Sequence, residues 1–346
     1  MTIASGRKVR LRRAVLADRP RAYAWLVDSD LARATMGQPL FPDHPAPTYE
    51  QFCDDYEPHF FEGSRPLDGR GLIVQADGAD IGFLAYRRID LPRDVVELDV
   101  WLAGLRHCGR GRGSEALMLA CEWLQQNFGV NRFVARPSRR NVRALRAVRR
   151  AGFRETDLPA GEVIAQLALP KPRYFDEVPL FRVLPPPAAL LEPTGDRTYV
   201  FVDSEFTSLA EPRLISIGAV ATDSAAFYRE LSDWRPEHCS EFVRAEVLPQ
   251  LEGGAVPHPV AADAFAHWIA ERAEAAPVTI VSDSGFDRWA LADLLGREDL
   301  PADADWRHVP IDAERLDDGA RALGLRRHHA LDDARALRYA LLGPLR

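Results

Sequence analysis

Residues 199–206 read Tyr-Val-Phe-Val-Asp-Ser-Glu-Phe. The β-branched and aromatic residues at the start of this stretch predict a strand over residues 198–202. Side chains two positions apart share one face of a strand, so the carboxylates of Asp203 and Glu205 project together from its end. Two neighbouring carboxylates repel each other, and a divalent cation removes that penalty. The stretch therefore predicts a sheet with an acidic edge that can bind metal ions.

Two further acidic segments follow predicted elements. Val278–Ser282 is a second apolar strand, and Asp287 comes shortly after it, where a helix begins. His328 precedes Asp333 by five positions, at the junction between a loop and a helix over residues 332–342. Each feature alone has an ordinary explanation: a solvated surface pair, a helix cap or surface histidines. As an ordered set, they indicate a single acidic cavity.

This set resembles the three-part signature of the DEDDh exonucleases, which have the RNase H-like, DnaQ-like fold. The likeness covers residues 197–342 and is closest to the small actinobacterial 3′→5′ exoribonucleases. That group shares an Asp-x-Glu-Phe motif, a Leu-Ile-Ser-Ile-Gly strand and a segment that ends in Val-Leu-Pro. Here they are residues 203–206, 214–218 and 242–249. Asp283 stands where many of these relatives carry asparagine.

The resemblance implies a two-metal hydrolase with Mg²⁺ or Mn²⁺ as cofactor. It assigns the metal ligands and catalytic carboxylates to Asp203, Glu205, Asp287 and Asp333. His328 would be the general base that deprotonates the attacking water. The neighbouring His329 is expected to tolerate substitution. The substrate implied is RNA with a single-stranded 3′ end, and possibly DNA.

The N-terminal half contains a second distinctive segment. Val95–Leu102 is a predicted strand, and three glycines alternate at positions 109, 111 and 113, immediately before a helical pattern over residues 112–126. Glycines between a strand and a helix let backbone N–H groups approach a phosphate at the positive end of the helix dipole. The alternating arginines also allow a simpler interpretation, a flexible basic loop.

Together with the Asn-to-Gly-Phe helix at residues 141–153, this loop resembles the GNAT acetyltransferases. The opening residues 9–12, followed by Ala17-Asp18 and Trp25-Leu26, are similar to the RimJ/RimL and aminoglycoside 6′-N-acetyltransferase branch of that family. The likeness covers residues 6–175. It implies a mixed, mostly antiparallel sheet with helices, and acetyl-CoA bound between the fourth and fifth strands, here residues 95–102 and 131–135.

The resemblance also supplies candidate site residues for this half. Those expected to bind acetyl-CoA are Trp101, Leu102, Gly109, Arg110, Gly111, Arg112, Gly113, Ser114 and Asn141. Glu97 and Asp99 share one face of their strand, and either could deprotonate an amine substrate. Two positions depart from the family pattern: Cys108 replaces a usual Gln or Arg, and Val148 replaces a Tyr that often serves as general acid.

The 346-residue chain is long enough for two α/β domains, and its charge supports them. Residues 1–153 carry 24 Lys and Arg against 18 Asp and Glu, whereas residues 154–346 carry 20 against 33. Prolines at residues 185–187 and 193 predict a semi-rigid linker. The expected organisation is a GNAT-like domain at 6–175, a linker at 176–196 and an exonuclease domain at 197–343. The acidic second half argues against broad wrapping of duplex DNA.

Other patterns exclude several classes of protein. The sequence has no apolar run of membrane-spanning length and no signal-peptide pattern, which predicts a cytoplasmic location without membrane contact. Its four cysteines show no zinc or disulfide spacing. The leading interpretation is an exoribonuclease fused to an N-acetyltransferase. One alternative treats the GNAT-like half as a non-catalytic module that senses acetyl-CoA or docks a partner. Another has both halves acting on one RNA-linked pathway.

Overall fold

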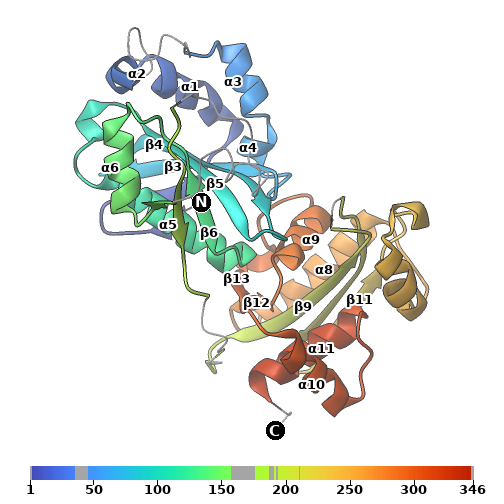
Figure 1. Ribbon diagram of the computed structural model, residues 1–346. Coiled ribbons are helices and arrows are strands. Elements are labelled where there is room, and N and C mark those ends of the chain that lie inside the picture. Colours follow the sequence, from blue (N-terminus) through green and yellow to red (C-terminus); the bar gives the residue numbers. More distant parts are fainter. Residues whose placement is uncertain are drawn as a thin grey trace. The chain divides into compact units, whose positions relative to one another are not determined.

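The structure is a computed structural model that describes residues 2–35, 46–156, 176–186, 191, 194–209 and 211–343. The chain forms two compact units (Figure 1). The first comprises residues 1–125 and 130–185, and the second comprises residues 126–129 and 186–346. Each unit combines one sheet with helices, so the α/β prediction is confirmed. No helix in these described ranges is long and apolar enough to cross a membrane.

An eight-stranded sheet forms the centre of the first unit, in the order β1-β2-β3-β4-β5-β6-β8-β7. Its strands are β1 (Thr2–Ser5), β2 (Arg10–Arg13), β3 (Gly69–Ala76), β4 (Ala79–Asp90), β5 (Val95–Leu102), β6 (Arg132–Ala135), β7 (Arg154–Glu155) and β8 (Leu180–Val183). Only β5 and β6 pair in parallel among these strands, and the other neighbours are antiparallel. The sheet is therefore mixed and mostly antiparallel, as expected.

Helices cover this sheet with apolar faces. They are α1 (Arg19–Val27), α2 (Asp30–Thr35), α3 (Tyr49–Asp55), α4 (His59–Glu62), α5 (Arg112–Phe128) and α6 (Val142–Arg150). In α5 the buried positions recur at helical spacing: Ala116, Leu117, Ala120, Cys121 and Leu124. The aromatic side chains of α3 and α4 pack with Ile73 and Phe83 of the sheet in one hydrophobic cluster.

The parallel pair β5 and β6 separates part-way along its length. Residues 95–97 of β5 pair with residues 132–134 of β6, and the pairing ends there. The remainder of β5, residues 98–102, continues without a β6 partner. Among the described residues, β6 therefore supplies no ladder partner to this part of β5.

The sheet of the first unit continues beyond the boundary expected at residue 175. Strand β8, which falls within the expected linker, pairs with both β6 and β7. The physical reason is apolar burial, since Val178 and Leu180 are 3% and 0% exposed. The expected linker segments at residues 187–190 and 192–193 lie outside the described residues, as does the end of the expected domain at residues 157–175.

The second unit contains a five-stranded sheet in the order β11-β10-β9-β12-β13. Its strands are β9 (Thr198–Phe206), β10 (Leu214–Ala221), β11 (Ala226–Glu230), β12 (Val278–Ser282) and β13 (Asp305–His308). The first three strands pair antiparallel, whereas β12 lies parallel to both β9 and β13. Its main helices are α8 (His258–Ala273), α9 (Gly285–Leu295), α10 (Ala313–Leu323) and α11 (Ala330–Leu342).

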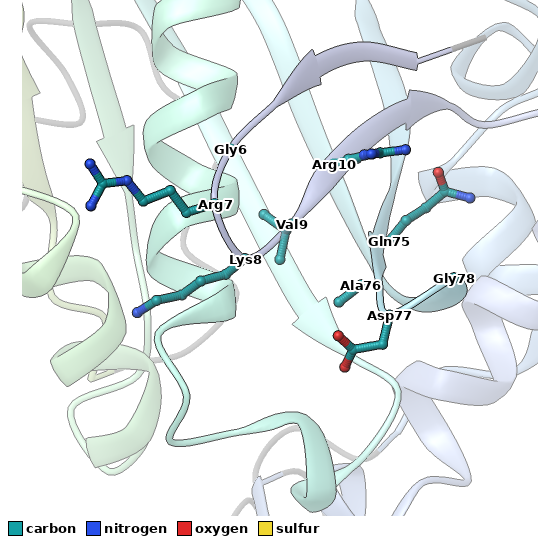
Figure 2. Close-up of a pocket in the computed structure, with 9 residues that line it drawn as sticks. All are labelled: Gly6, Arg7, Lys8, Val9, Arg10, Gln75, Ala76, Asp77 and Gly78. Atoms are coloured by element: carbon teal, nitrogen blue, oxygen red, sulfur yellow. The ribbon is translucent and has the colours of Figure 1, made fainter.

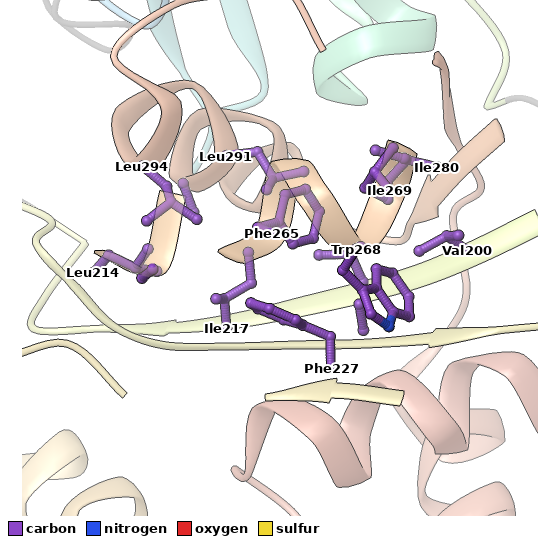
Figure 3. Close-up of a cluster of buried hydrophobic side chains, with 14 of the residues drawn as sticks. Val200, Leu214, Ile217, Phe227, Phe265, Trp268, Ile269, Ile280, Leu291 and Leu294 are labelled. Carbon is purple, nitrogen blue, oxygen red and sulfur yellow. The ribbon is translucent and has the colours of Figure 1, made fainter. Parts of the chain in front are cut away.

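The alternation of side chains along β9 determines what each face of this sheet contacts. Val200 and Val202 belong to the cluster formed with α8 and α9, part of which Figure 3 shows. Tyr199 and Phe201 belong to the cluster that contains Ala334 and Leu337 of α11. The helices therefore cover both faces of the sheet (Figure 1). By the same alternation, Asp203 and Glu205 lie on the α11 side, and the residue between them lies on the α9 side.

Helix α11 begins directly against β10 because of one glycine. A Cβ atom at Gly218 would lie 2.2 Å from the backbone nitrogen of Leu331 and 2.3 Å from the carbonyl carbon of Ala330. No side chain fits in that space, so glycine is required here for close packing. The contact brings the first turn of α11, with its acidic residues, next to the sheet.

Candidate functional sites

The acidic residues of the second unit meet where β9 and β12 end. These strands are parallel, so their carboxyl ends lie at the same edge of the sheet. Asp203 and Glu205 are among the last residues of β9, and Asp283 directly follows β12. The first turns of α9 and α11 bring Asp287 and Asp333 to this edge. These five residues are referred to below as the carboxylate cluster.

Two groups of possible metal ligands form within and beside the cluster. One consists of Glu205, His328 and Asp333, whose ligand atoms lie within 4.8 Å of one another. The other consists of Asp203, Asp283 and Asp287, whose ligand atoms meet the same limit. The structure thus brings together every residue that the sequence placed in this site, and it adds Asp283. Carboxylate oxygens of this kind suit Mg²⁺ and Mn²⁺.

Ser204 holds Asp287 in a defined orientation. Its side chain points to the α9 side of β9, and its Oγ donates a 2.6 Å hydrogen bond to Oδ1 of Asp287. The other oxygen, Oδ2, is buried and has no hydrogen-bond partner among the described residues. A buried carboxylate oxygen without a partner is unfavourable. Because Asp203 and Asp283 lie beside it, this arrangement fits a bound cation.

Asp333 is held from two sides. The backbone N–H of His328 donates a 2.8 Å hydrogen bond to its Oδ2, and the guanidinium of Arg327 forms an ion pair with its Oδ1. The same guanidinium donates through Nε to Oδ1 of Asp317 on α10, at 2.8 Å. The ion pair and the N–H bond keep the Asp333 carboxylate at a fixed place in the cluster.

His328 occupies a left-handed backbone conformation, with φ of +62°. Residues other than glycine rarely adopt this conformation, and functional sites often retain such strain. Its ring meets the ring of Phe242 nearly edge-on, with centroids 4.9 Å apart, and Phe242 is 53% exposed. His328 therefore lies between the carboxylate cluster and the solvent, where a general base is needed.

Burial and mutual repulsion raise the pKa values of the cluster. Burial, followed by the charge of Asp333, raises the pKa of Glu205 to about 8, and burial raises that of Asp283 to about 6. Burial and then the neighbouring carboxylates hold the pKa values of Asp203 and Asp287 well above the ordinary range. Without a cation to compensate its charge, the cluster therefore retains protons to a higher pH than ordinary carboxyl groups do.

The contribution of Glu205 to the stability of the metal-free protein is expected to fall as pH rises. In the unfolded chain Glu205 releases its proton near pH 4.5, but in the folded chain it does so at about 8. Between these values the folded state binds more protons, so the free energy of unfolding decreases with increasing pH. Thermal unfolding followed by circular dichroism in EDTA, from pH 5 to 8.5, measures this.

Glu205→Gln should flatten that decline, and Mn²⁺ should raise the melting temperature more at pH 8 than at pH 5. Exposed Glu274→Gln serves as the matched control. The same pH dependence of the melting temperature in Glu205→Gln and in the wild type would contradict the raised pKa of Glu205.

His329 does not meet the expectation that it tolerates substitution. It is 2% exposed, and its ring stacks on Tyr228 with centroids 4.6 Å apart. It is also the N-cap of α11, where its Nδ1 accepts a 3.4 Å hydrogen bond from the backbone N–H of Asp332. Replacement by alanine would remove packing and a cap, so an exposed histidine is the better control for His328.

The first unit contains a pocket of about 410 Å³ at the separated part of β5. Its walls come from α1, α2, the end of β5, the glycine loop and α6. Six of the residues expected to bind acetyl-CoA line it: Trp101, Leu102, Gly109, Arg112, Gly113 and Asn141. The pocket thus joins the strand, loop and helix that the sequence pattern associated with one ligand.

The other three expected residues lie beside the pocket and shape its loop. Gly111 has a positive φ of +77°, which glycine adopts without strain. The hydroxyl of Ser114 donates a 2.8 Å hydrogen bond to the carbonyl of Ala147, so it ties the start of α5 to α6. Arg110 is exposed. None of the three is among the residues that line the pocket in the described part of the chain.

A second cavity, of about 370 Å³, lies between the β1–β2 turn and the β3–β4 turn (Figure 2). Lys8 is one of its lining residues. A Cβ atom at Gly111 would lie 2.8 Å from the Lys8 ammonium, so this side chain adds a positive charge beside the glycine loop. The cavity itself contains no residue that the sequence assigned to a site.

Glu97 and Asp99 are both engaged in ion pairs. Glu97 is 6% exposed and accepts two hydrogen bonds from Arg136, of 2.8 and 3.0 Å. Asp99 accepts a 3.0 Å hydrogen bond from Nε of Arg87. Burial, then the charge of Asp99, raises the pKa of Glu97. Neither carboxylate lines the described pocket, and a role for either as a base stays a prediction.

Residues 8–154 match the family model for the acetyltransferase (GNAT) domain. The first unit contains a GNAT domain. Among solved structures, the chain is similar to aminoglycoside acetyltransferase AAC(6′)-Ib in complex with coenzyme A, with 18% identity and a TM-score of 0.38 over 51% of this chain and 94% of that one. It is also similar to RimL, the ribosomal L7/L12 α-N-protein acetyltransferase, with 14% identity and a TM-score of 0.41 over 53% and 98%.

A domain from Methanocaldococcus jannaschii is also similar, with 17% identity and a TM-score of 0.36 over 51% of this chain and 99% of that one. No curated protein matches the chain.

Two of the residues that line the pocket at β5 are the ones that depart from the family pattern. Cys108 lies at the start of the glycine loop, and Val148 lies on α6. Val148 is 3% exposed and has no group that can donate a proton. If the domain transfers acetyl groups, the proton for the departing thiolate must therefore come from a group other than this side chain.

Proposed function

We propose that the second unit is a divalent-metal-dependent 3′→5′ exonuclease that acts on RNA. The observation that supports this most is the convergence of Asp203, Glu205, Asp287 and Asp333 with His328. They come from three separate segments and, together with Asp283, form two groups whose ligand atoms lie within 4.8 Å of one another. Asp287, a member of one group, has a buried oxygen with no hydrogen-bond partner among the described residues. The resemblance of the same residues to the DEDDh signature favours nuclease chemistry.

The cluster residues have distinct roles in this proposal. Asp203, Asp283 and Asp287 would hold one cation, and Glu205 and Asp333 would hold a second. Divalent ions supply charge stabilisation to the attacking and leaving oxygens of a phosphodiester. His328 accepts the proton of the attacking water, because its ring lies beside Glu205 and Asp333 in one of the two ligand groups. Ser204 and the backbone N–H of His328 keep two of the carboxylates in place.

Release of acid-soluble product from 3′-labelled single-stranded RNA and DNA, with and without Mn²⁺, tests this function. Metal-dependent release from RNA in excess over DNA is the expected result. Equal release from both would indicate that the substrate is any single-stranded nucleic acid and not RNA in particular. No release from either would refute the proposal.

We also propose that the GNAT domain binds acetyl-CoA and transfers its acetyl group to an amine. The family match and the pocket formed by β5, the glycine loop and α6 support this. The loop precedes the 17-residue helix α5, whose first N–H groups lack partners within the helix and favour a phosphate. Lys8 adds positive charge at that position.

A second candidate is a GNAT domain that binds acetyl-CoA without transferring it. Val148 and the ion pairs of Glu97 and Asp99 favour this alternative, since no free acid or base is apparent among these positions. Transfer of labelled acetyl groups to small amines, peptides and tRNA distinguishes the two. Saturable binding of acetyl-CoA without transfer to any class would support the binding module.

Gly111→Val in the full-length protein is expected to weaken acetyl-CoA binding. Valine in a left-handed conformation is strained by about 1–3 kcal/mol, and relief of that strain moves the loop away from the phosphate. The expected loss is roughly 10–100-fold in affinity, measured by calorimetric titration. Gly195→Val is the matched control, because a Cβ there meets nothing within 4 Å and its φ is not positive. Unchanged affinity in Gly111→Val would contradict the assignment of the loop.

A further inference from the structure

The carboxylate cluster faces one arginine. Within the described residues, no other lysine or arginine forms an ion pair with any of its five carboxylates. The adjacent Arg326 is directed elsewhere: it pairs with Asp332 at 2.7 Å and with Glu252 at 2.9 Å. Two neighbouring arginines therefore have different environments, and only Arg327 contacts the cluster.

The position of Arg327 does not depend on Asp333 alone. Its Nε is anchored to Asp317 of α10, and its side chain is 29% exposed, whereas that of Asp333 is 8% exposed. The guanidinium has five N–H donors. Two are used, by Asp317 and Asp333, and Nη2 forms no hydrogen bond in the described structure. The Arg327 side chain is thus partly exposed beside the cluster, with donors available.

A substrate phosphate is the group that matches these donors. The half of the chain that contains the cluster carries 20 Lys and Arg against 33 Asp and Glu, so its general field repels a polyanion. A nucleic-acid strand that reaches the cluster therefore requires local positive charge. The planar fork of arginine binds phosphate oxygens with defined geometry.

We propose that Arg327 binds a phosphate of the nucleic-acid strand in the nuclease site and that Asp317 positions it to do so. This inference rests on the nuclease function proposed above. Arg327 is then a substrate-binding residue in addition to the metal ligands and His328. A structural ion pair with Asp333 is the competing explanation, and it would leave the salt dependence of RNA binding unchanged.

The test compares Arg327→Ala with Arg326→Ala in the full-length protein. The probe is a fluorescent single-stranded oligoribonucleotide, bound in Ca²⁺ over a series of KCl concentrations. Loss of a phosphate contact should weaken binding roughly 10–100-fold. It should also reduce the slope of log K against log salt by about 0.7. Arg327→Lys should restore the slope while binding remains weaker than in the wild type.

Arg326→Ala should keep the slope of the wild type. Calorimetric titration of Mn²⁺ should show affinity in Arg327→Ala at least equal to that of the wild type, because a positive charge beside Asp333 has been removed. If the wild type degrades RNA but Arg327→Ala keeps the wild-type slope of log K against log salt, the inference about Arg327 is wrong and the proposed function still stands. A wild type that neither binds nor degrades RNA would overturn the proposed function, and the inference with it.

Discussion

Asp203→Ala is expected to abolish nucleotide release while the fold is retained. Asp203 lies near the end of β9, with a ligand atom within 4.8 Å of those of Asp283 and Asp287, so its loss removes a ligand from that group. Loss of a catalytic metal removes several kcal/mol of transition-state stabilisation, which corresponds to a rate decrease of ~10³-fold or more. The measurement is single-turnover degradation of labelled RNA in saturating Mn²⁺.

The fold should survive because the neighbouring carboxylates repel Asp203, so the variant loses no attractive charge interaction with them. Burial and four neighbouring carboxylates raise its pKa, so its removal relieves strain in the metal-free protein. We expect Asp203→Ala to melt at the wild-type temperature or above it in EDTA. The exposed Asp263→Ala on α8 is the control for activity. Near-normal degradation by Asp203→Ala would show that the site has been assigned to the wrong residues.

His328→Asn is expected to lower the turnover of bound RNA roughly 10²–10⁴-fold, the usual contribution of a general base. Asparagine is preferred to alanine because it tolerates the left-handed backbone at this position, where φ is +62°. RNA affinity should change much less than turnover, because a base acts in the transition state. Single-turnover rates and binding in Ca²⁺ separate the two quantities.

The matched control for His328 is His267→Ala. The His267 side chain is 79% exposed on α8 and contacts only Glu271 among the described residues. It therefore reports the effect of removing an imidazole without disturbing the cluster. An undiminished turnover in His328→Asn would exclude this residue as the base, and an equal loss in His267→Ala would indicate a nonspecific effect.

Much of the second site could be predicted because it depends on local patterns. The alternation in β9 places Asp203 and Glu205 on one face, and the parallel pairing with β12 brings Asp287 to the same edge. These relations follow from strand period and strand direction. The order of the motifs then favoured one site, and in the structure these residues form two groups of possible metal ligands.

Residues that act through tertiary contacts could not be found in this way. Ser204 bonds Asp287, 83 positions away, and Arg327 is anchored by α10. The motif distinguished His328 from His329, but it did not show that His329 is buried, stacks on Tyr228 and caps α11. The burial of His329 could not be predicted because it arises from contact with Tyr228, which lies about 100 positions earlier in the chain.

In the first unit, too, features set by local patterns could be predicted and those set by tertiary contacts could not. The glycine loop and the helix after it were evident from spacing, and six of the expected residues line one pocket. Strand β8 was not expected, because the prolines that follow it suggested that the linker had already begun. Trp25 and Leu26 of α1 also line the pocket; the resemblance to the RimJ/RimL branch included them but assigned them no role. Their role depends on how α1 packs beside β5, which sequence spacing does not specify.

Shortening of a 5′-labelled single-stranded RNA, with Mn²⁺ or with EDTA, tests the central claim most directly. A 3′→5′ exonuclease with this cluster should produce a ladder that shortens from the 3′ end in Mn²⁺ while every product keeps the 5′ label. EDTA should abolish the ladder, and Asp203→Ala should lack it in Mn²⁺. Immediate release of the label as a mononucleotide, internal cleavage, or an unchanged ladder in EDTA would contradict the account.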